Sequence, residues 1–215
     1  MRTGILGGTF NPIHNAHLHI AEAALQQCHL DQVLFLPAAI PPHKEIAENV
    51  SFSHRFEMVR LATTHNPAFK VSDLEARRPG TSFSVDTLLS LKELHPEDNF
   101  FFIIGLDSFR DITTWKEYQR LFELTNIVVA SRPGPGDDEP LQFLPVAIKD
   151  DFCYDAKSLK LRHKSGQELI FVHDTRLDIS STMIRDRAAQ GHSISDTVAS
   201  PVAAYIQQHH LYRKT

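Results

Sequence analysis

Short apolar runs that alternate with helix-like segments constrain the fold of this chain more than any other feature. Asn99–Gly105 (NFFFIIG) and 126–131 (NIVVAS) show no alternation of apolar and polar positions. Such runs are typical of strands that are buried on both faces of a sheet. Further strands are expected at 2–6, 32–37, 69–72 and 168–173, and helices at 17–29, 53–63, 81–94, 114–124, 180–190 and 200–209.

The repeated order of strand and helix predicts an α/β fold of the Rossmann-like, doubly wound kind, with a mostly parallel sheet and helices on both faces. A length of 215 residues suits a single domain, 1–215. We expect a small C-terminal helical part, about 180–215, to complete the ligand site. The stretch 141–165 gives no clear pattern. In sheets of this kind, ligands bind at the carboxyl ends of the strands.

Charge and cysteine usage narrow the classes of function. The formal net charge is −4, so the chain lacks the broad positive field that binds nucleic acid. No apolar run approaches the roughly 20 residues of a membrane span, and no N-terminal signal segment is visible. Cys28 and Cys153 lack the spacing of a metal site or a redox motif, and Cys28 falls in an apolar pattern typical of the core. We therefore expect a cytoplasmic protein without a nucleic-acid or membrane partner.

A glycine turn followed by two histidines stands behind the first expected strand, in the stretch GGTFNPIHNAH. Gly7 and Gly8 let the backbone approach a bulky anion closely. His14 and His17 lie three apart at an expected helix start, where free N–H groups and partial positive charge favour phosphate. An isolated HxxH is more often a surface or N-cap pair. It can also be half of a metal site, but no third ligand stands at a familiar spacing. The preceding Gly-Gly-Thr-Phe favours phosphate.

A second polar segment, ISSTMIR, begins a late expected helix. The hydroxyls of Ser180, Ser181 and Thr182, with the free N–H groups of the helix start, suit an anion. Arg185 lies one turn beyond Thr182 and can reach the same anion with its planar set of donors. The alternative is a simple serine N-cap beside an exposed arginine.

A third segment, GLDS, follows the strongest expected strand. The carboxylate of Asp107 can accept hydrogen bonds from ribose hydroxyls or a base amino group, and Gly105 lets a nucleotide pack closely. The alternative is a turn in which Asp107 caps a helix.

Three other side chains are candidates for ligand contacts. Trp115 is the only tryptophan, and it can either stack on a flat ring or pack in the core. His43 and Lys44 stand on a loop that two prolines stiffen. There they can contact phosphate or point into solvent.

Taken together and in this order, these segments resemble the nicotinate-nucleotide adenylyltransferase family of the HxGH nucleotidyltransferase superfamily. The stretch 7–17 is similar to the family pattern GGTFDPxHxGH, and Ser180, Thr182 and Arg185 match SxTxxR. PPHK at 41–44, GLDS at 105–108, TW at 114–115 and RPG at 132–134 match further family segments. Three positions depart from the pattern: Ala16 stands in the glycine slot, Asn11 replaces the commoner aspartate, and SFS at 82–84 stands where Ser-Tyr-Thr is common.

This resemblance implies a reaction in NAD biosynthesis: ATP and nicotinate mononucleotide give deamido-NAD and pyrophosphate. It implies that His14 and His17 act on the ATP phosphates and on the transition state. Mg²⁺ is expected to arrive on the ATP phosphates, with no metal-binding residues of the chain itself. The resemblance assigns ATP to Gly7, Gly8, Thr9, Phe10, Gly105, Asp107, Ser180, Ser181, Thr182 and Arg185, and the mononucleotide to His43, Lys44, Ser84 and Trp115.

Two other functions are weighed against this one. Nicotinamide mononucleotide or another phosphorylated acceptor could replace nicotinate mononucleotide, although Ser84 and Trp115 favour a pyridine ring. A nucleotide-binding sensor without catalysis has Ala16 as its only support in the sequence. The sequence leaves open whether the chain forms a homodimer.

Overall fold

The computed structural model describes residues 1–42, 50–130, 144–155, 160–172 and 177–213. An eight-stranded sheet with strand order β3-β2-β1-β4-β5-β8-β7-β6 forms its centre. The pairs from β3 through to β8 are parallel, and β7 pairs antiparallel with β8 and with β6. The strands are β1 (Arg2–Gly8), β2 (Gln32–Pro37), β3 (Phe69–Val71), β4 (Asn99–Gly105), β5 (Asn126–Ala130), β6 (Phe152–Asp155), β7 (Lys160–His163) and β8 (Glu168–Val172).

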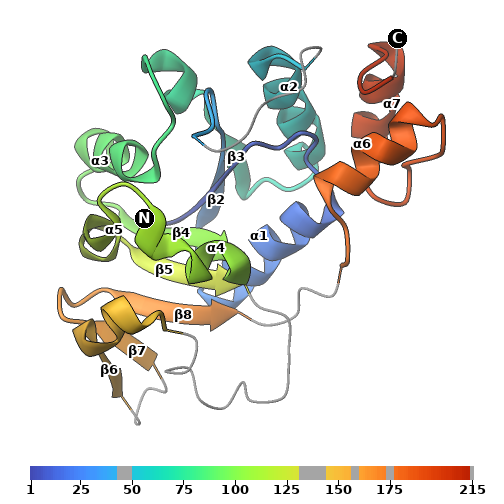
Figure 1. Cartoon of the computed structure of the whole chain (residues 1–215). Helices are drawn as coiled ribbons and strands as arrows, with labels where there is room; N and C mark the ends of the chain where they lie inside the picture. The colour runs from blue at the N-terminus through green and yellow to red at the C-terminus, as the bar shows by residue number, and fades with distance from the viewer. Residues whose placement is uncertain (43–49, 131–143, 156–159, 173–176, 214–215) are drawn as a thin grey trace.

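Helices cover both faces of this sheet, as predicted (Figure 1). The helices are α1 (Asn15–Gln27), α2 (Phe52–Thr63), α3 (Ser84–Leu94), α4 (Leu106–Arg110), α5 (Tyr118–Leu124), α6 (Ser181–Ala189) and α7 (Ser200–Gln208). Short 3₁₀ turns lie at Leu74–Arg77, Ile112–Thr114 and Val146–Asp151. Within the described ranges, no helix combines the length and the apolar character that crossing a membrane requires.

The central strand β4 shows why the two layers form. Phe101 and Ile103 pack into the core beneath α1, α2 and α7. Phe100, Phe102 and Ile104 pack into the second core beneath α3, α4 and α5. Since successive side chains of a strand point to opposite faces, an unbroken apolar run fills both cores at once.

Three local predictions from the sequence need correction. The range 114–124 is not one helix: Glu117 has a φ of +48°, and α5 begins only at Tyr118, because a left-handed residue interrupts the right-handed turn. The unreadable stretch from 141 contains, in its described part, a 3₁₀ turn and the strands β6 and β7. Helix α1 begins at Asn15, two residues before the predicted start.

The sheet topology places the candidate segments. From β1 the chain adds β2 and β3 on one side of the sheet, whereas β4 and β5 lie on the other side. Ligands of such sheets bind outside the strand ends where the order reverses. Strands β1 and β4 are direct neighbours, with Leu6 opposite Ile103. The turn after Gly8 and the segment after Gly105 therefore lie next to each other.

Candidate functional site

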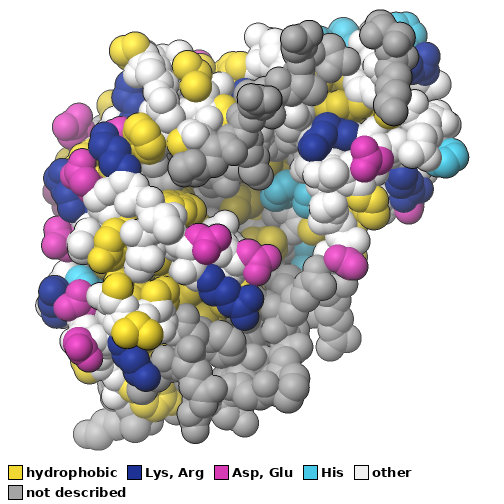
Figure 2. Space-filling view, viewed as in Figure 1, with side chains coloured by type: hydrophobic (Ala, Val, Ile, Leu, Met, Phe, Trp, Pro, Cys, Tyr) yellow, Lys and Arg dark blue, Asp and Glu magenta, His cyan; other side chains and the backbone are white. Residues whose placement is uncertain are grey.

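A cavity of about 600 Å³ opens at this point of the sheet, and its size is typical of small-molecule sites. Figure 2 shows histidine side chains gathered in the hollow between α4 and the C-terminal helices. The start of α1, the junction of β4 with α4, and the residues ahead of α6 supply most of its wall. Its lining includes His14, Ala16, His17, His19, Gly105, Asp107, Ser108, Arg110 and Ile179.

The two predicted histidines face this cavity together. His14 is the N-cap of α1, and its backbone N–H donates to Nδ1 of His17 at 3.2 Å. The two rings have centroids 3.7 Å apart, and the ring of Phe10 packs edge-on against His17 at 5.0 Å. Because Nδ1 of His17 accepts a hydrogen bond, the proton of the neutral ring sits on Nε2. His17 therefore carries an oriented N–H donor.

His14 is buried, at 7% exposure, and desolvation lowers its pKa to about 4. Its Nδ1 has no hydrogen-bond partner among the described residues. The imidazole is thus neutral near pH 7 in the free protein. An anion in the cavity would favour the protonated ring and so raise this pKa.

Side chains from distant parts of the chain hold the turn between Phe10 and His14. The hydroxyl of Tyr212 donates to Oδ1 of Asn11 at 2.7 Å, and both residues are buried. Nη1 of Arg185 donates to the carbonyl of Asn11 at 3.0 Å, and the hydroxyl of Ser181 donates to the carbonyl of Pro12 at 3.0 Å. The C-terminal helices thereby fix the turn through which the chain enters α1.

The start of α6 uses its polar residues largely within the protein. The hydroxyl of Ser180 accepts from the backbone N–H of Met183 at 3.2 Å, as an N-cap does. Nη2 of Arg185 donates to Oγ1 of Thr182 at 3.2 Å. Ser180 and Thr182 are exposed. These contacts leave the helix start beside the turn, where it can still present N–H groups to an anion.

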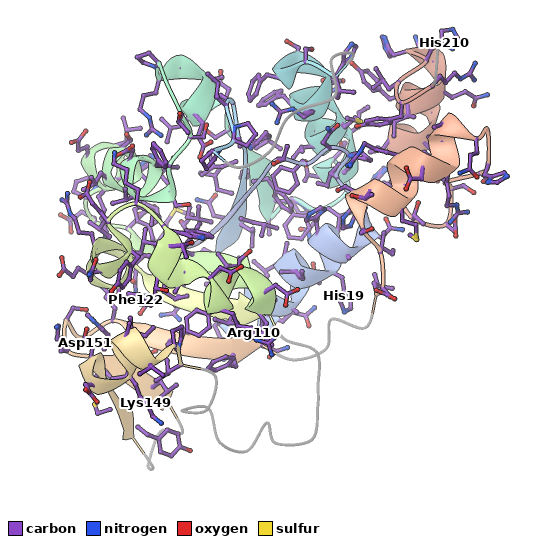
Figure 3. All side chains as sticks on the ribbon, viewed as in Figure 1. His19, Arg110, Phe122, Lys149, Asp151 and His210 are labelled. Carbon is purple, nitrogen blue, oxygen red and sulfur yellow. The ribbon has the colours of Figure 1, made fainter. Side chains whose placement is uncertain are left out.

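Gly105 and Asp107 lie on the opposite wall. Gly105, not Asp107, is the N-cap of α4. A Cβ atom at Gly105 would meet nothing within 4 Å, so its side of the cavity is open to a flat group. The carboxylate of Asp107 is 99% exposed and lies 3.6 Å from Arg110. In Figure 3 Arg110 projects from α4 and His19 from α1.

The remaining predicted residues lie apart from this cavity's described lining. Gly7, Gly8 and Thr9 end β1 and begin the turn, and the ring of Phe10 is buried. Ser84 is the first residue of α3, and Trp115 packs half-buried against Phe102, with ring centroids 6.3 Å apart. His43 and Lys44 fall outside the described residues.

The sequence did not identify His19 and Arg110 in the cavity wall, nor Arg55 and Tyr212, which contact the turn or its side chain, and it indicated Ser108 only as part of the GLDS segment. Arg55 could have been noticed. Its spacing of three and four from Met58 and Val59 places it on the buried face of α2. A charge on an apolar helix face indicates a buried polar partner.

Comparisons with known proteins show which family this chain belongs to. The cytidylyltransferase-like family model matches residues 5–187. A probable nicotinate-nucleotide adenylyltransferase of Syntrophotalea carbinolica is 55% identical over 213 residues, which cover 99% of this chain and 98% of that relative. A relative of the same name from Geobacter sulfurreducens is 51% identical over 212 residues, with coverage of 99% and 98%.

The fold is similar to that of the Plasmodium falciparum nicotinic acid mononucleotide adenylyltransferase complexed with NaAD. The TM-score is 0.73 at 21% identity, over 98% of this chain and 97% of that one. Sequence identity above 50% over 99% of the chain is stronger evidence of family membership than similarity of fold alone. The chain belongs to the cytidylyltransferase-like family and, within it, to the nicotinate-nucleotide adenylyltransferases.

Proposed function

We propose that this protein transfers the adenylyl group of ATP to nicotinate mononucleotide, which forms deamido-NAD and releases pyrophosphate. The observation that carries the proposal is the oriented pair of His14 and His17. It faces a nucleotide-sized cavity in a chain 55% identical to a relative with that name.

The chemistry requires alignment and charge stabilisation rather than a protein base. An oxygen of the mononucleotide phosphate attacks the α-phosphorus of ATP and forms the new P–O bond. The bond from the α-phosphorus to the bridging oxygen breaks, and its electron pair leaves with pyrophosphate. The attacking phosphate has a second pKa of about 6, so it is already largely dianionic near neutral pH. Donors aimed at the α-phosphate then lower the barrier.

In this proposal, the adenosine of ATP lies over Gly105, where the open space would admit a flat ring. Asp107 would accept from its hydroxyl or amino groups. The Nε2–H of His17 would donate to the phosphates, and His14 would gain a proton as the anion binds. The Gly7–Phe10 backbone, the Ser180–Thr182 helix start and Arg185 would surround the phosphates. Ser84, Trp115, His43 and Lys44 are proposed for the mononucleotide.

The donor set of the cavity fits a metal ion that is held mainly by substrate. Asp107 is the single carboxylate among its described lining residues. Over the described ranges, no group of three or more His, Cys, Asp or Glu side chains is placed to hold a metal. Mg²⁺ dehydrates reluctantly and often binds through substrate phosphates and water. We propose that ATP carries it, and when bound there it would supply positive charge that neutralises the phosphates.

Pyrophosphate release from ATP, Mg²⁺ and nicotinate mononucleotide tests the reaction. We expect turnover by the wild type and loss of it in His17→Ala. Nicotinamide mononucleotide and phosphopantetheine serve as competing acceptors in the same assay, and we expect a higher kcat/KM for nicotinate mononucleotide. Equal kcat/KM for the acid and the amide would remove the preference for the acid. Tight ATP binding without pyrophosphate from any acceptor would instead favour a nucleotide sensor.

A further inference from the structure

Arg55, in helix α2, is a fully buried charged side chain that the proposed reaction does not use. We infer that Arg55 is a positioning residue that holds the ATP side and the mononucleotide side of the site in register. This inference rests on the proposed function, because that function defines which side of the site binds ATP and which side binds the mononucleotide. Arg55 acts through the backbone of two loops and not through contact with a nucleotide.

The guanidinium joins the ends of two neighbouring strands. Nη1 donates to the carbonyl of Thr9 at 2.8 Å and to that of Ala38 at 2.7 Å, and Nη2 donates to the carbonyl of Ala39 at 3.3 Å. Thr9 belongs to the glycine turn that follows β1. Ala38 and Ala39 follow β2. The N–H of Ala38 also donates to the carbonyl of Gly8. Arg55 is thus a further link between the segments that follow β1 and β2.

The same segment after β2 is tied on its other edge to the start of α3. The hydroxyl of Ser82 accepts from the backbone N–H groups of Ala39 at 3.1 Å and Ile40 at 3.3 Å. The N–H of Ser82 donates to the carbonyl of Ile40 at 2.9 Å. Ser84, proposed for the mononucleotide, lies two residues further on at the first position of α3. A continuous chain of hydrogen bonds therefore runs from Thr9, through Arg55, to the mononucleotide side.

The hydrogen-bonding geometry of arginine explains its presence at this buried position better than a gain in stability does. Burying a charge is costly, and a buried ion is a poor way to gain stability. Burial lowers the pKa of Arg55, and Nε has no partner among the described residues. The planar guanidinium nevertheless reaches three carbonyls on two separate segments, an arrangement that one lysine ammonium cannot match. The cost in stability of burying this charge therefore falls where the two substrates must meet. A small misplacement of the reacting groups there slows the displacement reaction steeply.

Arg55→Lys tests the inference, with Arg2→Lys as the matched control. Arg2 also donates to two backbone carbonyls, those of His29 at 3.1 Å and Cys28 at 2.8 Å, but it lies at the opposite end of β1. We expect folded Arg55→Lys to lose roughly 10- to 100-fold in kcat, with KM for each nucleotide changed less than about threefold. Arg2→Lys should keep its kcat. Added guanidinium ion should restore turnover to Arg55→Ala and not to His17→Ala.

Amide hydrogen exchange gives a second readout that needs no turnover. Arg55→Lys should speed amide exchange in 9–11 and 38–40, and Arg2→Lys should not. Unchanged kcat or unchanged exchange in folded Arg55→Lys would overturn the inference. So would a fall in kcat that matches the fall in Tm in both variants, since that pattern describes a merely structural residue. A wild type that releases no pyrophosphate would overturn the proposed reaction, while exchange would still decide whether Arg55 holds the two segments together.

Discussion

The backbone N–H of His14 donates to Nδ1 of His17 at 3.2 Å, so the first histidine orients the second. The spacing of three residues makes this contact available only at a helix start, where N–H groups have no partner within the helix. The ring of Phe10 also packs against His17 in a T-shaped contact, with ring centroids 5.0 Å apart. These contacts therefore fix the orientation of the His17 ring, and its Nε2–H is the hydrogen-bond donor that they orient.

His17→Asn should separate orientation from donation. The Asn oxygen can still accept from the N–H of His14, but the variant has no group in the place of Nε2–H. We expect kcat to fall by roughly 10²- to 10³-fold, as when one transition-state donor is removed. The Tm should change little. His17→Gln, whose amide can reach the Nε2 position, is the comparison, and it should retain more activity. Full turnover by His17→Asn would contradict the assigned role.

His14 should make stability depend on pH. Its folded pKa of about 4 lies below the ordinary value of 6.5, so between these values the unfolded chain binds the proton more readily. Stability is therefore full above pH 6.5 and falls as the pH drops towards 4, by about 3 kcal/mol in all. His14→Asn, which keeps a favoured N-cap residue, should flatten this part of the profile.

Urea unfolding from pH 4 to 7 measures this effect. Burial also shifts the pKa of Glu75 upward and that of His163 downward, so the difference between wild type and His14→Asn isolates the one group. His192→Asn, at an exposed position, is the control and should follow the wild type. Parallel profiles for wild type and His14→Asn would show that His14 does not titrate as described.

Gly105→Ala should impair binding without harming the fold. Gly105 has a φ of −74°, which any residue adopts, and its Cβ position is open. The methyl group would project where the adenosine is proposed to lie. We expect KM for ATP to rise roughly tenfold or more, with an unchanged or slightly higher Tm.

Gly166→Ala should have the opposite effect: it should lower stability and leave ATP binding unchanged. Gly166 has a φ of +93° with nothing near its Cβ position. An alanine there is strained and should lower stability by about 1 kcal/mol, while KM for ATP stays the same. Equal KM values for Gly105→Ala and wild type would place the adenosine elsewhere.

Arg185→Lys should weaken the link between α6 and the turn. Lysine cannot donate to both the Asn11 carbonyl and the Thr182 hydroxyl in the arginine geometry. We expect kcat/KM for ATP to fall by about tenfold, the equivalent of one charged hydrogen bond. Arg187→Lys, in the same helix, alters only an exposed pair with Asp196 and should behave as wild type. Similar kinetics for both variants would remove Arg185 from the site.

The sequence predicts those features that local chemistry decides. The apolar run of β4 specifies a strand with two buried faces, and the glycine turn and the GLDS segment meet because parallel neighbours share one edge. The antiparallel pair of β6 and β7 is not predicted, since strands of four residues lack a long periodic pattern. The helical spacing of Arg55 indicates that it is buried, but the partners of Arg55 and Tyr212 in the turn are not predicted, because they lie 46 and 201 residues away along the chain. No local pattern encodes a contact over that distance.

Because Tyr212 bonds to Asn11, the turn that follows β1 can be fixed only late in the synthesis of the chain. The turn that is proposed to receive the phosphates emerges from the ribosome early, but its partners Ser181, Arg185 and Tyr212 follow it by 169, 174 and 201 residues. An unfinished chain therefore carries the glycine turn and both histidines without the groups that fix them. Under the proposed function, we therefore expect the turn to become competent to bind nucleotide only after the C-terminal helices dock against it.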